Sequence, residues 1–356
     1  MILVVSNMYP SERHPNYGVF VKNFYERFKS DRPVDLIALQ KEEKYSKKII
    51  NYLIFFLRVF FNFLNKKYDL VYVHYAGYNG LPILLAKLFN KKTKLVVNVH
   101  GSDVTPEKKL EELTNFLTKY LVRSADLTVV PSNYFERVVK EKYGDIFTFI
   151  SPSAGIDLEL FNPRNKVINN EEKLIIGYVG RIDSQKGWDT LLYALKELVC
   201  DIQNIRLVMV GSGSENLKAI ELIKKLELDK YVEKIEMVKQ NELVNIYRKI
   251  DLFIFPSTRS GESLGLVGLE AMACGTPVIG SACAGIETYV KDCYNGFLFN
   301  PGDIKHLKEK IKEYYYSSLT CKISLSENAI LTSKEYEAHK IHVKLKSVID
   351  TILGEG

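Results

Sequence analysis

Two glutamates stand eight positions apart, Glu262 and Glu270, in the segment Ser-Gly-Glu-Ser-Leu-Gly-Leu-Val-Gly-Leu-Glu. An apolar run of strand type, Leu252 to Pro256, precedes them, and the pattern predicts a helix that begins near Leu264. The free amides and the positive end of such a helix suit a diphosphate. At 1.5 Å per helical residue the carboxylates would lie roughly 10 Å apart, too far for the ~5 Å pair of a retaining glycosidase. We therefore assign them to hydroxyl recognition at opposite ends of one nucleotide sugar.

Two cations follow another apolar run, in Gly180-Arg-Ile-Asp-Ser-Gln-Lys-Gly187 directly after Leu174 to Val179. Arg181 and Lys186 would emerge at the carboxyl end of a strand, where they could neutralise a leaving diphosphate without a metal. Arginine offers a planar fork and lysine a compact point charge to phosphate oxygens. The alternative is that both merely solvate a loop.

The N-terminal half holds two weaker candidates. His100 ends the apolar run from Leu95, in His-Gly-Ser-Asp103, and either hydrogen-bonds a sugar hydroxyl or only caps its strand. Gly18 precedes an expected helix and either admits a phosphate close to the backbone or makes an ordinary turn.

Several motifs are missing from the sequence. It contains no Asp-x-Asp, His-x-x-x-His or Cys-x-x-Cys, and no Walker loop. Gly211-Ser-Gly213 is only half of a dinucleotide fingerprint and is better read as a strand-to-helix turn. We therefore predict no metal site and no cofactor, NAD included.

Composition is typical of a globular enzyme, with 46% hydrophobic and 26% charged residues among 356. This length favours two domains. The five cysteines show no paired spacing, which favours a reducing cytosol. The opening Met-Ile-Leu-Val-Val-Ser-Asn reads as a first strand and not as a signal peptide.

The net charge of +6 comes from the N-terminal half, because residues 1–165 carry 24 Lys and Arg against 17 Asp and Glu, whereas residues 166–356 carry 25 against 26. No stripe of interleaved arginine and aromatic residues supports nucleic acid as the partner. An anionic membrane face or a phosphorylated acceptor is the better match.

Strand-length apolar runs alternate with helix-length segments throughout the chain, which predicts an α/β protein with parallel, doubly wound sheets. The expected strands are 2–6, 34–39, 70–74, 95–100 and 127–131, then 174–179, 207–210, 235–238, 252–255 and 277–280. We predict Rossmann-like domains at 1–160 and 161–332 that face each other across a cleft, which would hold the ligands. The remaining residues, 333–356, would form a helix that returns to the first domain.

The segment from Ile49 to Leu64 has 13 apolar residues in 16 and is bracketed by Lys47-Lys48 and Lys66-Lys67. It is too short and too charged to span a bilayer. A crossover helix in the core and an interfacial membrane helix fit it about equally. The basic N-terminal half leads us to favour membrane contact.

Taken together, these motifs resemble those of the retaining glycosyltransferases of family 4, which have the GT-B fold, over essentially the whole chain. The likeness rests on Glu262 to Glu270 with the following Ala-Met-Ala-Cys-Gly-Thr-Pro-Val-Ile, Gly180-Arg181, Lys186-Gly187, His100 to Asp103, Pro131-Ser132 and Asn295-Gly296-Phe297. The opening Tyr9-Pro10 with Tyr17 to Val21 looks like members that build bacterial surface polysaccharides of the teichuronic acid or capsule type.

The resemblance implies a role for each matching residue. Glu270 would bind the ribose, Glu262 and His100 the donor sugar, and Arg181 and Lys186 the diphosphate. The diphosphate seat would be completed by the backbone amides of Ser263, Leu264, Gly265 and Leu266. Many relatives have Glu-Gly-Phe-Gly where this chain has Glu262-Ser-Leu-Gly265, so a particular donor does not carry over.

The resemblance thus implies a metal-independent, retaining transfer of a sugar from a nucleoside diphosphate sugar to a saccharide acceptor. We expect the acceptor to be lipid-linked and to serve cell-surface polysaccharide synthesis. The expected location is the cytoplasm, with peripheral contact to the inner face of the plasma membrane. The alternatives are an epimerase or a phosphorylase of the same fold, and a non-catalytic subunit that binds nucleotide sugars.

Overall fold

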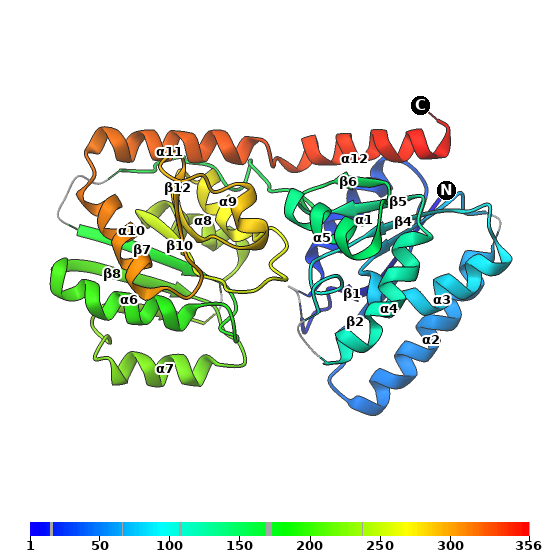
Figure 1. Ribbon diagram of the computed structural model, residues 1–356, viewed down its shortest axis with the longest axis horizontal. Helices are drawn as coiled ribbons and strands as arrows, with labels where there is room; N and C mark the ends of the chain where they lie inside the picture. Colours follow the sequence, from blue (N-terminus) through cyan, green and yellow to red (C-terminus); the bar gives the residue numbers. More distant parts are fainter. Residues whose placement is uncertain (15–16, 66, 107–108, 169–172, 237, 356) are drawn as a thin grey trace. The chain divides into compact units, whose positions relative to one another are not determined.

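The computed structural model describes residues 1–14, 17–65, 67–106, 109–168, 173–236 and 238–355. The chain divides into two compact units (Figure 1). The first unit comprises residues 1–154 together with the C-terminal residues from His339 on, and the second comprises 155–338.

The first unit is built on a parallel sheet with the strand order β2-β1-β3-β4-β5-β6. Its strands are β1 (Ile2–Tyr9), β2 (Val34–Gln40), β3 (Leu70–His74), β4 (Lys94–Asn98), β5 (Leu127–Val130) and β6 (Thr148–Ile150). The chain runs from β1 outward to β2 and then returns to β3 on the other side of β1. The loops that follow β1 and β3 therefore flank a point where the strand order reverses, which is where open α/β sheets bind ligands.

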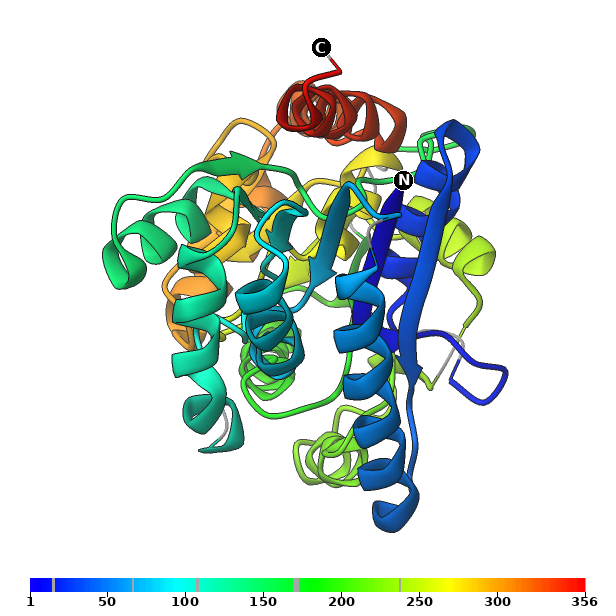
Figure 2. The same cartoon turned by 90° about the vertical axis from the view of Figure 1, so that its right-hand side faces the viewer.

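Helices cover both faces of this sheet. They are α1 (Val19–Asp31), α2 (Tyr45–Leu64), α3 (Ala76–Phe89), α4 (Lys109–Arg123), α5 (Asn133–Tyr143) and α12 (Ala338–Leu353). Successive strand residues point to opposite faces, so Leu3 and Val5 share one core with α2, α3, α4 and α5, whereas Ile2 and Val4 share the other with α1 and α12. The two layers of helices are visible in Figure 2.

The last helix, α12, packs on the first unit. Leu345 and Ile349 are buried in the core that contains Ile2 and Val4. At its ends α12 is tied to α1, where His342 Nε2 lies 2.8 Å from Asp31 Oδ2, and to the residue after α1, where Arg32 pairs with Asp350.

The second unit is built on another parallel sheet, with the order β12-β11-β10-β7-β8-β9. Its strands are β7 (Lys173–Val179), β8 (Asn204–Val210), β9 (Val232–Ile235), β10 (Leu252–Phe255), β11 (Val278–Ser281) and β12 (Gly296–Phe299). Its helices are α6 (Trp188–Asp201), α7 (Asn216–Lys225), α8 (Gln240–Lys249), α9 (Leu266–Ala273), α10 (Ile304–Tyr316) and α11 (Leu319–Lys334), with a 3₁₀ turn η1 (Ala284–Thr288). The strand order reverses between β7 and β10, so the loops after these two strands are neighbours at the carboxyl edge.

The predicted α/β class with two parallel, doubly wound sheets is confirmed. Two edge strands, β6 and β12, were not predicted, and the strand expected at 235–238 lies at Val232–Ile235. All three are strands of three or four residues at a sheet edge, where one side is open and the apolar pattern is weak.

The packing of α12 predicts a specific loss of stability. Ile349→Ala should lower the free energy of unfolding by about 2–5 kcal/mol, because it opens a cavity at a fully buried position. Urea unfolding followed by circular dichroism measures this. Thr351→Ala, on the exposed side of the same helix, is the matched control and should change stability by less than about 0.5 kcal/mol. Equal stability of the two variants would mean that α12 is not part of this core.

Candidate functional site

The loop that follows β7 packs closely against the loop that follows β10. Gly187 begins α6 with a φ of +69°, and a β-carbon at this position would lie 1.9 Å from the carbonyl oxygen of Pro256. Thr258 N–H donates to the carbonyl of Gln185 at 2.9 Å. Only glycine allows this approach without strain, and the contact brings Lys186 beside the residues after β10.

Lys186 and Glu262 form a nearly buried ion pair. Lys186 Nζ lies 2.6 Å from Glu262 Oε2, and the two side chains are 13% and 11% exposed. Ser257 Oγ donates to the same carboxylate oxygen at 2.8 Å. Burial alone would raise the pKa of Glu262, but the charge and hydrogen bond of Lys186 and the hydroxyl of Ser257 outweigh burial, so its pKa lies below the ordinary value. Glu262 is therefore an anion that holds a cation in place.

Glu270 is buried in α9 in a different environment. Tyr247 Oη donates to Glu270 Oε2 at 3.1 Å, and no cation pairs with this carboxylate within the described part of the chain. Burial raises the pKa of Glu270 to about 7, although hydrogen bonds from Tyr247 and Gln240 oppose the shift. A carboxylate that is close to half protonated at neutral pH gains strongly from further hydroxyl donors.

The helix α9 begins at Leu266, two residues later than predicted, so Glu270 lies just over one turn along it instead of two. Gly265 precedes the helix with a φ of +71°, and a β-carbon there would lie 2.0 Å from the ring of Phe255. The close contact seats the start of α9 directly on the end of β10. The amide of Gly268 donates to the carbonyl of Gly265 at 3.0 Å, whereas the amides of Leu266 and Val267 come before the first bonds of the helix and can serve an anion.

The backbone of the segment from Ser263 to Leu266 packs closely against Gly285. Gly285 N–H donates to the carbonyl of Glu262 at 3.0 Å, and a β-carbon on Gly285 would lie 1.9 Å from the carbonyl oxygen of Ser263. Leu264 is fully buried. Packing against the core therefore sets the shape of the backbone that carries the predicted donor-binding residues. These are Glu262, Ser263, Leu264, Gly265, Leu266 and, further along α9, Glu270.

Arg181 differs from Lys186. Its side chain is 67% exposed, and Nη1 lies 2.8 Å from Asp183 Oδ2 in the same loop. Asp183 also accepts from the amide and hydroxyl of Ser214 in the loop after β8, at 2.8 and 2.9 Å. Arg181 therefore follows β7 as predicted, and it pairs with Asp183 whereas Lys186 pairs with Glu262.

In the first unit, His100 follows β4 and lies beside a second histidine, His74. His100 Nε2 lies 3.1 Å from His74 Nδ1, and the ring stacks on Tyr75 at a centroid distance of 5.3 Å. Burial lowers the pKa of His100 to about 3, so its imidazole is neutral. Asp103 accepts from the amides of His100 and Ala76, at 2.9 and 3.1 Å, and so fixes the loop.

Gly18 begins α1 with a φ of +76°, and a β-carbon there would lie 2.7 Å from the carbonyl carbon of Met8. Glycine is thus required for the start of α1 to pack against the end of β1. The sequence left two roles open for Gly18. The structure shows the role in a turn, and the binding of a phosphate stays a prediction.

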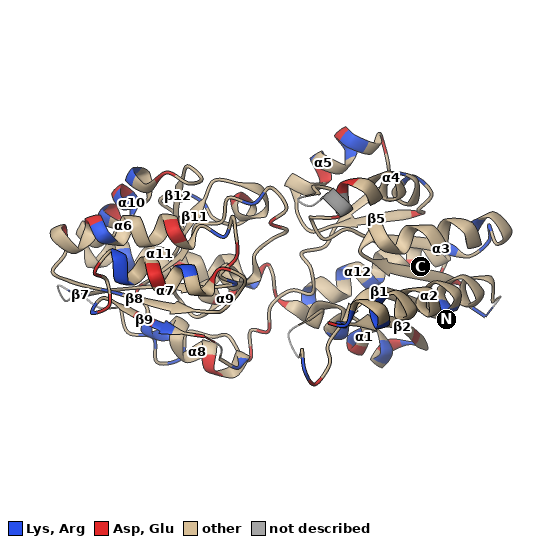
Figure 3. Ribbon diagram, turned by 90° about the horizontal axis from the view of Figure 1, so that it is seen from below, with Lys and Arg blue, Asp and Glu red and all other residues tan. Residues whose placement is uncertain are grey.

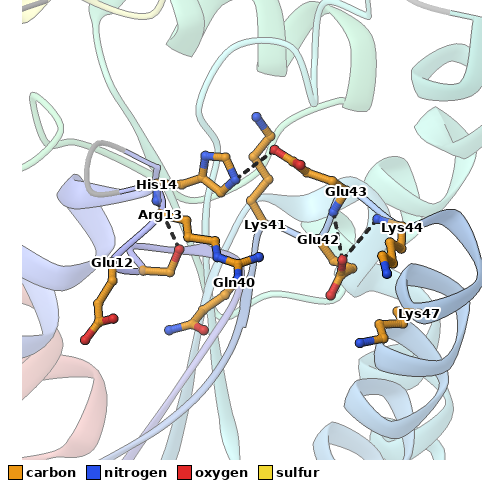
Figure 4. A pocket seen from close by; sticks show the side chains of 10 residues that line it. Glu12, Arg13, His14, Gln40, Lys41, Glu42, Glu43, Lys44 and Lys47 are labelled. Carbon is orange, nitrogen blue, oxygen red and sulfur yellow. Dashed lines mark hydrogen bonds and ion pairs between the residues drawn. The ribbon is translucent and has the colours of Figure 1, made fainter.

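A polar hollow of about 660 Å³ lies near the carboxyl ends of β1 and β2 (Figure 4). It is lined by Ser11, Glu12, Arg13, His14, Gln40, Lys41, Glu42, Glu43, Lys44 and Lys47. His14 Nε2 lies 3.3 Å from Glu43 Oε1, and Glu42 accepts from the amides of Glu43 and Lys44 at 3.0 Å each. Four of the lining side chains are permanent cations, and the sequence motifs did not point to this hollow.

The structure also adds partners that the sequence did not single out. Ser257 and Tyr247 each donate to one of the two glutamates, and Asp183 holds Arg181. Ser257 and Asp183 could have been found from their places in the loops that follow β10 and β7. Tyr247 could not, because in the sequence it is one more apolar position of an amphipathic helix.

The described residues show neither a metal-binding cluster nor a membrane-spanning helix. No three His, Cys, Asp or Glu side chains among them are arranged to hold a metal ion. None of the helices in that part of the chain has the length and apolar character needed to cross a bilayer.

Comparison with protein families gives two matches that together cover most of the chain. Residues 16–158 match the model described as Glycosyltransferase Family 4, and residues 161–330 match that of Glycosyl transferases group 1.

Among curated relatives, the chain is 26% identical to the N-acetyl-alpha-D-glucosaminyl L-malate synthase of Bacillus anthracis, over 66% of this chain and 62% of that protein. This match therefore spans less than two thirds of the relative. The chain is also 26% identical to the uncharacterized glycosyltransferase MJ1178 of Methanocaldococcus jannaschii, over 99% of both chains.

Two solved structures share the fold over nearly the whole chain. Sucrose-phosphate synthase from Thermosynechococcus elongatus aligns with a TM-score of 0.82 at 19% identity, covering 100% of both chains. Anabaena Alr3699/HepE in complex with UDP aligns with a TM-score of 0.80 at 18% identity, covering 98% of this chain and 99% of the other. At such identities the likeness concerns the fold alone.

The ion pair predicts strong coupling between its two members. Lys186→Met should lower the free energy of unfolding by about 3–5 kcal/mol, because it leaves the Glu262 charge buried without its cation. Adding Glu262→Gln should recover much of that loss, since the double variant buries no charge. Urea unfolding of the two single variants and the double variant measures the coupling. The exposed pair Lys196 and Glu227 is the matched control and should show almost none. Additive effects at Lys186 and Glu262 would contradict the pair.

We predict that the free energy of unfolding depends on pH through Glu270. Its pKa is raised from 4.5 to about 7 in the folded protein, so the folded state binds more protons between these values and the free energy of unfolding falls as pH rises from about 5 to about 7. Glu270→Gln should remove up to roughly 3 kcal/mol of that fall. Unfolding at a series of pH values measures it, with the exposed Glu221→Gln as control. A pH profile identical to that of the wild type would mean that Glu270 is already ionised at low pH.

Proposed function

We propose a specific reaction for this chain from the premise that it belongs to the glycosyltransferases of family 4, also described as glycosyl transferases group 1, with the GT-B fold. The chain transfers a sugar from a nucleoside diphosphate sugar to a saccharide acceptor, with retention of configuration and without a metal ion. The acceptor is lipid-linked and belongs to cell-surface polysaccharide synthesis at the inner face of the plasma membrane.

One observation carries this proposal. The Lys186–Glu262 ion pair and the free amides at the start of α9 lie at the carboxyl ends of β7 and β10, beside the point where the strand order reverses. A cation, an anion and a helix N-terminus at such a point suit a nucleotide sugar, because the diphosphate meets positive groups and the sugar meets an acceptor of hydrogen bonds.

Lys186 stabilises the leaving diphosphate in this proposal. An ammonium group has three N–H donors, and the recorded bond to Glu262 uses one of them, which leaves two for phosphate oxygens. The pair also fixes the ammonium before the substrate arrives, so little reorganisation accompanies the build-up of negative charge. Arg181 supplies a second cation, for which it exchanges the Asp183 carboxylate for phosphate.

Glu262 and Glu270 recognise hydroxyls. Glu262 is ionised and accepts from the donor sugar, whereas Glu270 accepts from the ribose, whose hydroxyls stabilise its charged form. His100 is neutral, so it contributes a hydrogen bond to the donor sugar and no charge. Gly18 lets the start of α1 approach the phosphates. The acceptor oxygen bonds to the anomeric carbon on the face from which the diphosphate leaves, and the departing phosphate takes the acceptor's proton. Retention therefore needs no side chain as a covalent nucleophile.

UDP is the nucleotide that we test first, because Alr3699/HepE was solved with UDP and with UDP-glucose. The polar hollow near β1 and β2 is our candidate for the acceptor. Its cations, Arg13, Lys41, Lys44 and Lys47, suit an anionic head group such as the phosphate of a lipid-linked saccharide.

Sugar transfer should depend on Lys186, Arg181 and Glu270. With a UDP-sugar and a phospholipid-linked saccharide, Lys186→Ala, Arg181→Ala and Glu270→Ala should each lower kcat/KM by about 100-fold or more, because each removes a group that binds the departing nucleotide. Lys196→Ala, an exposed lysine of α6, should keep wild-type activity. Circular dichroism checks that each variant is folded.

The configuration of the product tests the stereochemistry. Proton NMR of the product should show the same anomeric configuration as in the donor. An inverted product would overturn retention, and an epimerised donor without acceptor would indicate an epimerase. Stabilisation by UDP without any turnover would indicate a binding subunit, and full activity of all three variants would remove the proposed site.

A further inference from the structure

We propose that the outward faces of α2, α3 and α4 together form one docking surface for an anionic lipid bilayer. The inference deepens the membrane contact proposed above, and it rests on exposed side chains and charges of the first unit alone. It goes beyond the segment from Ile49 to Leu64, because two further helices take part.

The helix α2 is apolar on both sides, although the core uses only one. Phe55, Val59 and Phe63 are buried against the sheet. Leu53, Leu57 and Phe61 follow the same spacing on the outward side, where they are 61%, 50% and 63% exposed. Packing within the unit therefore explains half of the apolar residues of α2 and leaves a stripe of a little over two turns unexplained.

The helices α3 and α4 carry matching stripes. Leu81, Leu85 and Leu88 of α3 are 42%, 45% and 67% exposed and recur at intervals of four and three residues. Leu113, Phe116 and Tyr120 of α4 are 69%, 58% and 58% exposed and recur at intervals of three and four. Such intervals place each set on one side of its helix.

The three stripes belong to one layer. Residues of α2, α3 and α4 pack against the same face of the sheet, α2 contacts α3, and α3 contacts α4. Figure 2 shows the three helices side by side. Because each helix has its buried side on the sheet, the exposed stripes lie on the outer side of the same layer and form a patch larger than single exposed residues would.

Charge decides the occupant. Residues 45–98, which include α2 and α3, contain nine Lys and Arg and a single acidic residue, Asp69, which pairs with the N-terminal ammonium group. The sequence of α4 is closer to balance, with three Lys and Arg against two Glu. Lys91, Lys92 and Lys94 line a hollow of about 850 Å³ together with Leu88 and Phe89, so cations border the apolar patch directly. The lysines and arginines are marked in Figure 3.

An apolar patch bordered by cations suits the interface of an anionic bilayer, where apolar side chains enter the head-group region and cations meet phosphates. A second copy of the chain fits less well, since pairing of identical surfaces would bring like charges together. The bilayer is therefore the occupant that both the apolar and the charged residues fit.

Sedimentation with vesicles tests the surface. The full chain should bind vesicles of phosphatidylcholine with about one third phosphatidylglycerol, and binding should weaken several-fold at high salt or without the anionic lipid. The triple variant Leu53→Gln, Leu88→Gln, Leu113→Gln, with one change in each helix, should lower partitioning at least about tenfold. The double variant Lys91→Gln, Lys92→Gln should lower it at least about fivefold.

Matched controls lie on the second unit. Leu217→Gln changes a leucine of α7 that is 74% exposed, and Lys224→Gln with Lys225→Gln changes two exposed lysines at the end of the same helix. These variants should bind vesicles as the wild type does. Circular dichroism and urea unfolding confirm that all variants are folded.

Vesicle binding needs no donor, so its result is separate from that of the proposed reaction. Failure of the wild type to bind anionic vesicles at low salt would overturn the inference, as would wild-type binding by the triple variant. A dimer in lipid-free solution that the triple variant abolishes would assign the surface to a second copy and overturn it too. If the wild type binds anionic vesicles but transfers no sugar, this result would count against the proposed function alone.

Discussion

The ion pair between Lys186 and Glu262 is the interaction on which the second unit's site depends. A buried carboxylate is costly unless a cation and hydrogen bonds compensate it, and here Lys186 and Ser257 do so from the loops after β7 and β10. These loops can meet only because the strand order reverses between the two strands and because Gly187 lets the backbones approach. The pair thus links the topology of the sheet to the placement of a charged group where a nucleotide sugar is expected to bind.

Environment, more than residue type, sets the behaviour of the buried acids. Glu262 has a cation and a low pKa, Glu270 has a tyrosine and a pKa of about 7, and Asp103 accepts backbone amides but still has its pKa raised to about 6 by burial. The first acts as an anchor for a charge, the second is poised to respond to hydroxyl donors, and the third fixes a loop. Three carboxylates that look alike in the sequence therefore have three different tasks.

The first unit combines two kinds of surface. Its carboxyl edge carries neutral His100 and the polar hollow lined by cations, whereas the layer of α2, α3 and α4 exposes apolar stripes bordered by lysines. Lys44 and Lys47 line the hollow and lie at the start of α2, the helix that also carries one of the outward stripes. The proposed lipid-linked acceptor would have an anionic head and an apolar tail, and the first unit offers a cationic hollow for one and apolar stripes for the other.

The sequence by itself determined the α/β class and the two parallel sheets. It also placed Arg181, Lys186 and Glu262 in loops that follow strands, and Glu270 in a helix. Strand periodicity and glycine positions are local signals, and the central strands are apolar enough to show them. It did not reveal the short edge strands β6 and β12 or the partners Ser257 and Tyr247. Only the tertiary structure decided that Lys186 pairs with Glu262 while Arg181 pairs with Asp183, and that three outward stripes lie in one layer. The reason is physical: an ion pair, a pKa and a shared surface depend on which distant segments are brought together, and the spacing of residues along a chain does not contain that distance.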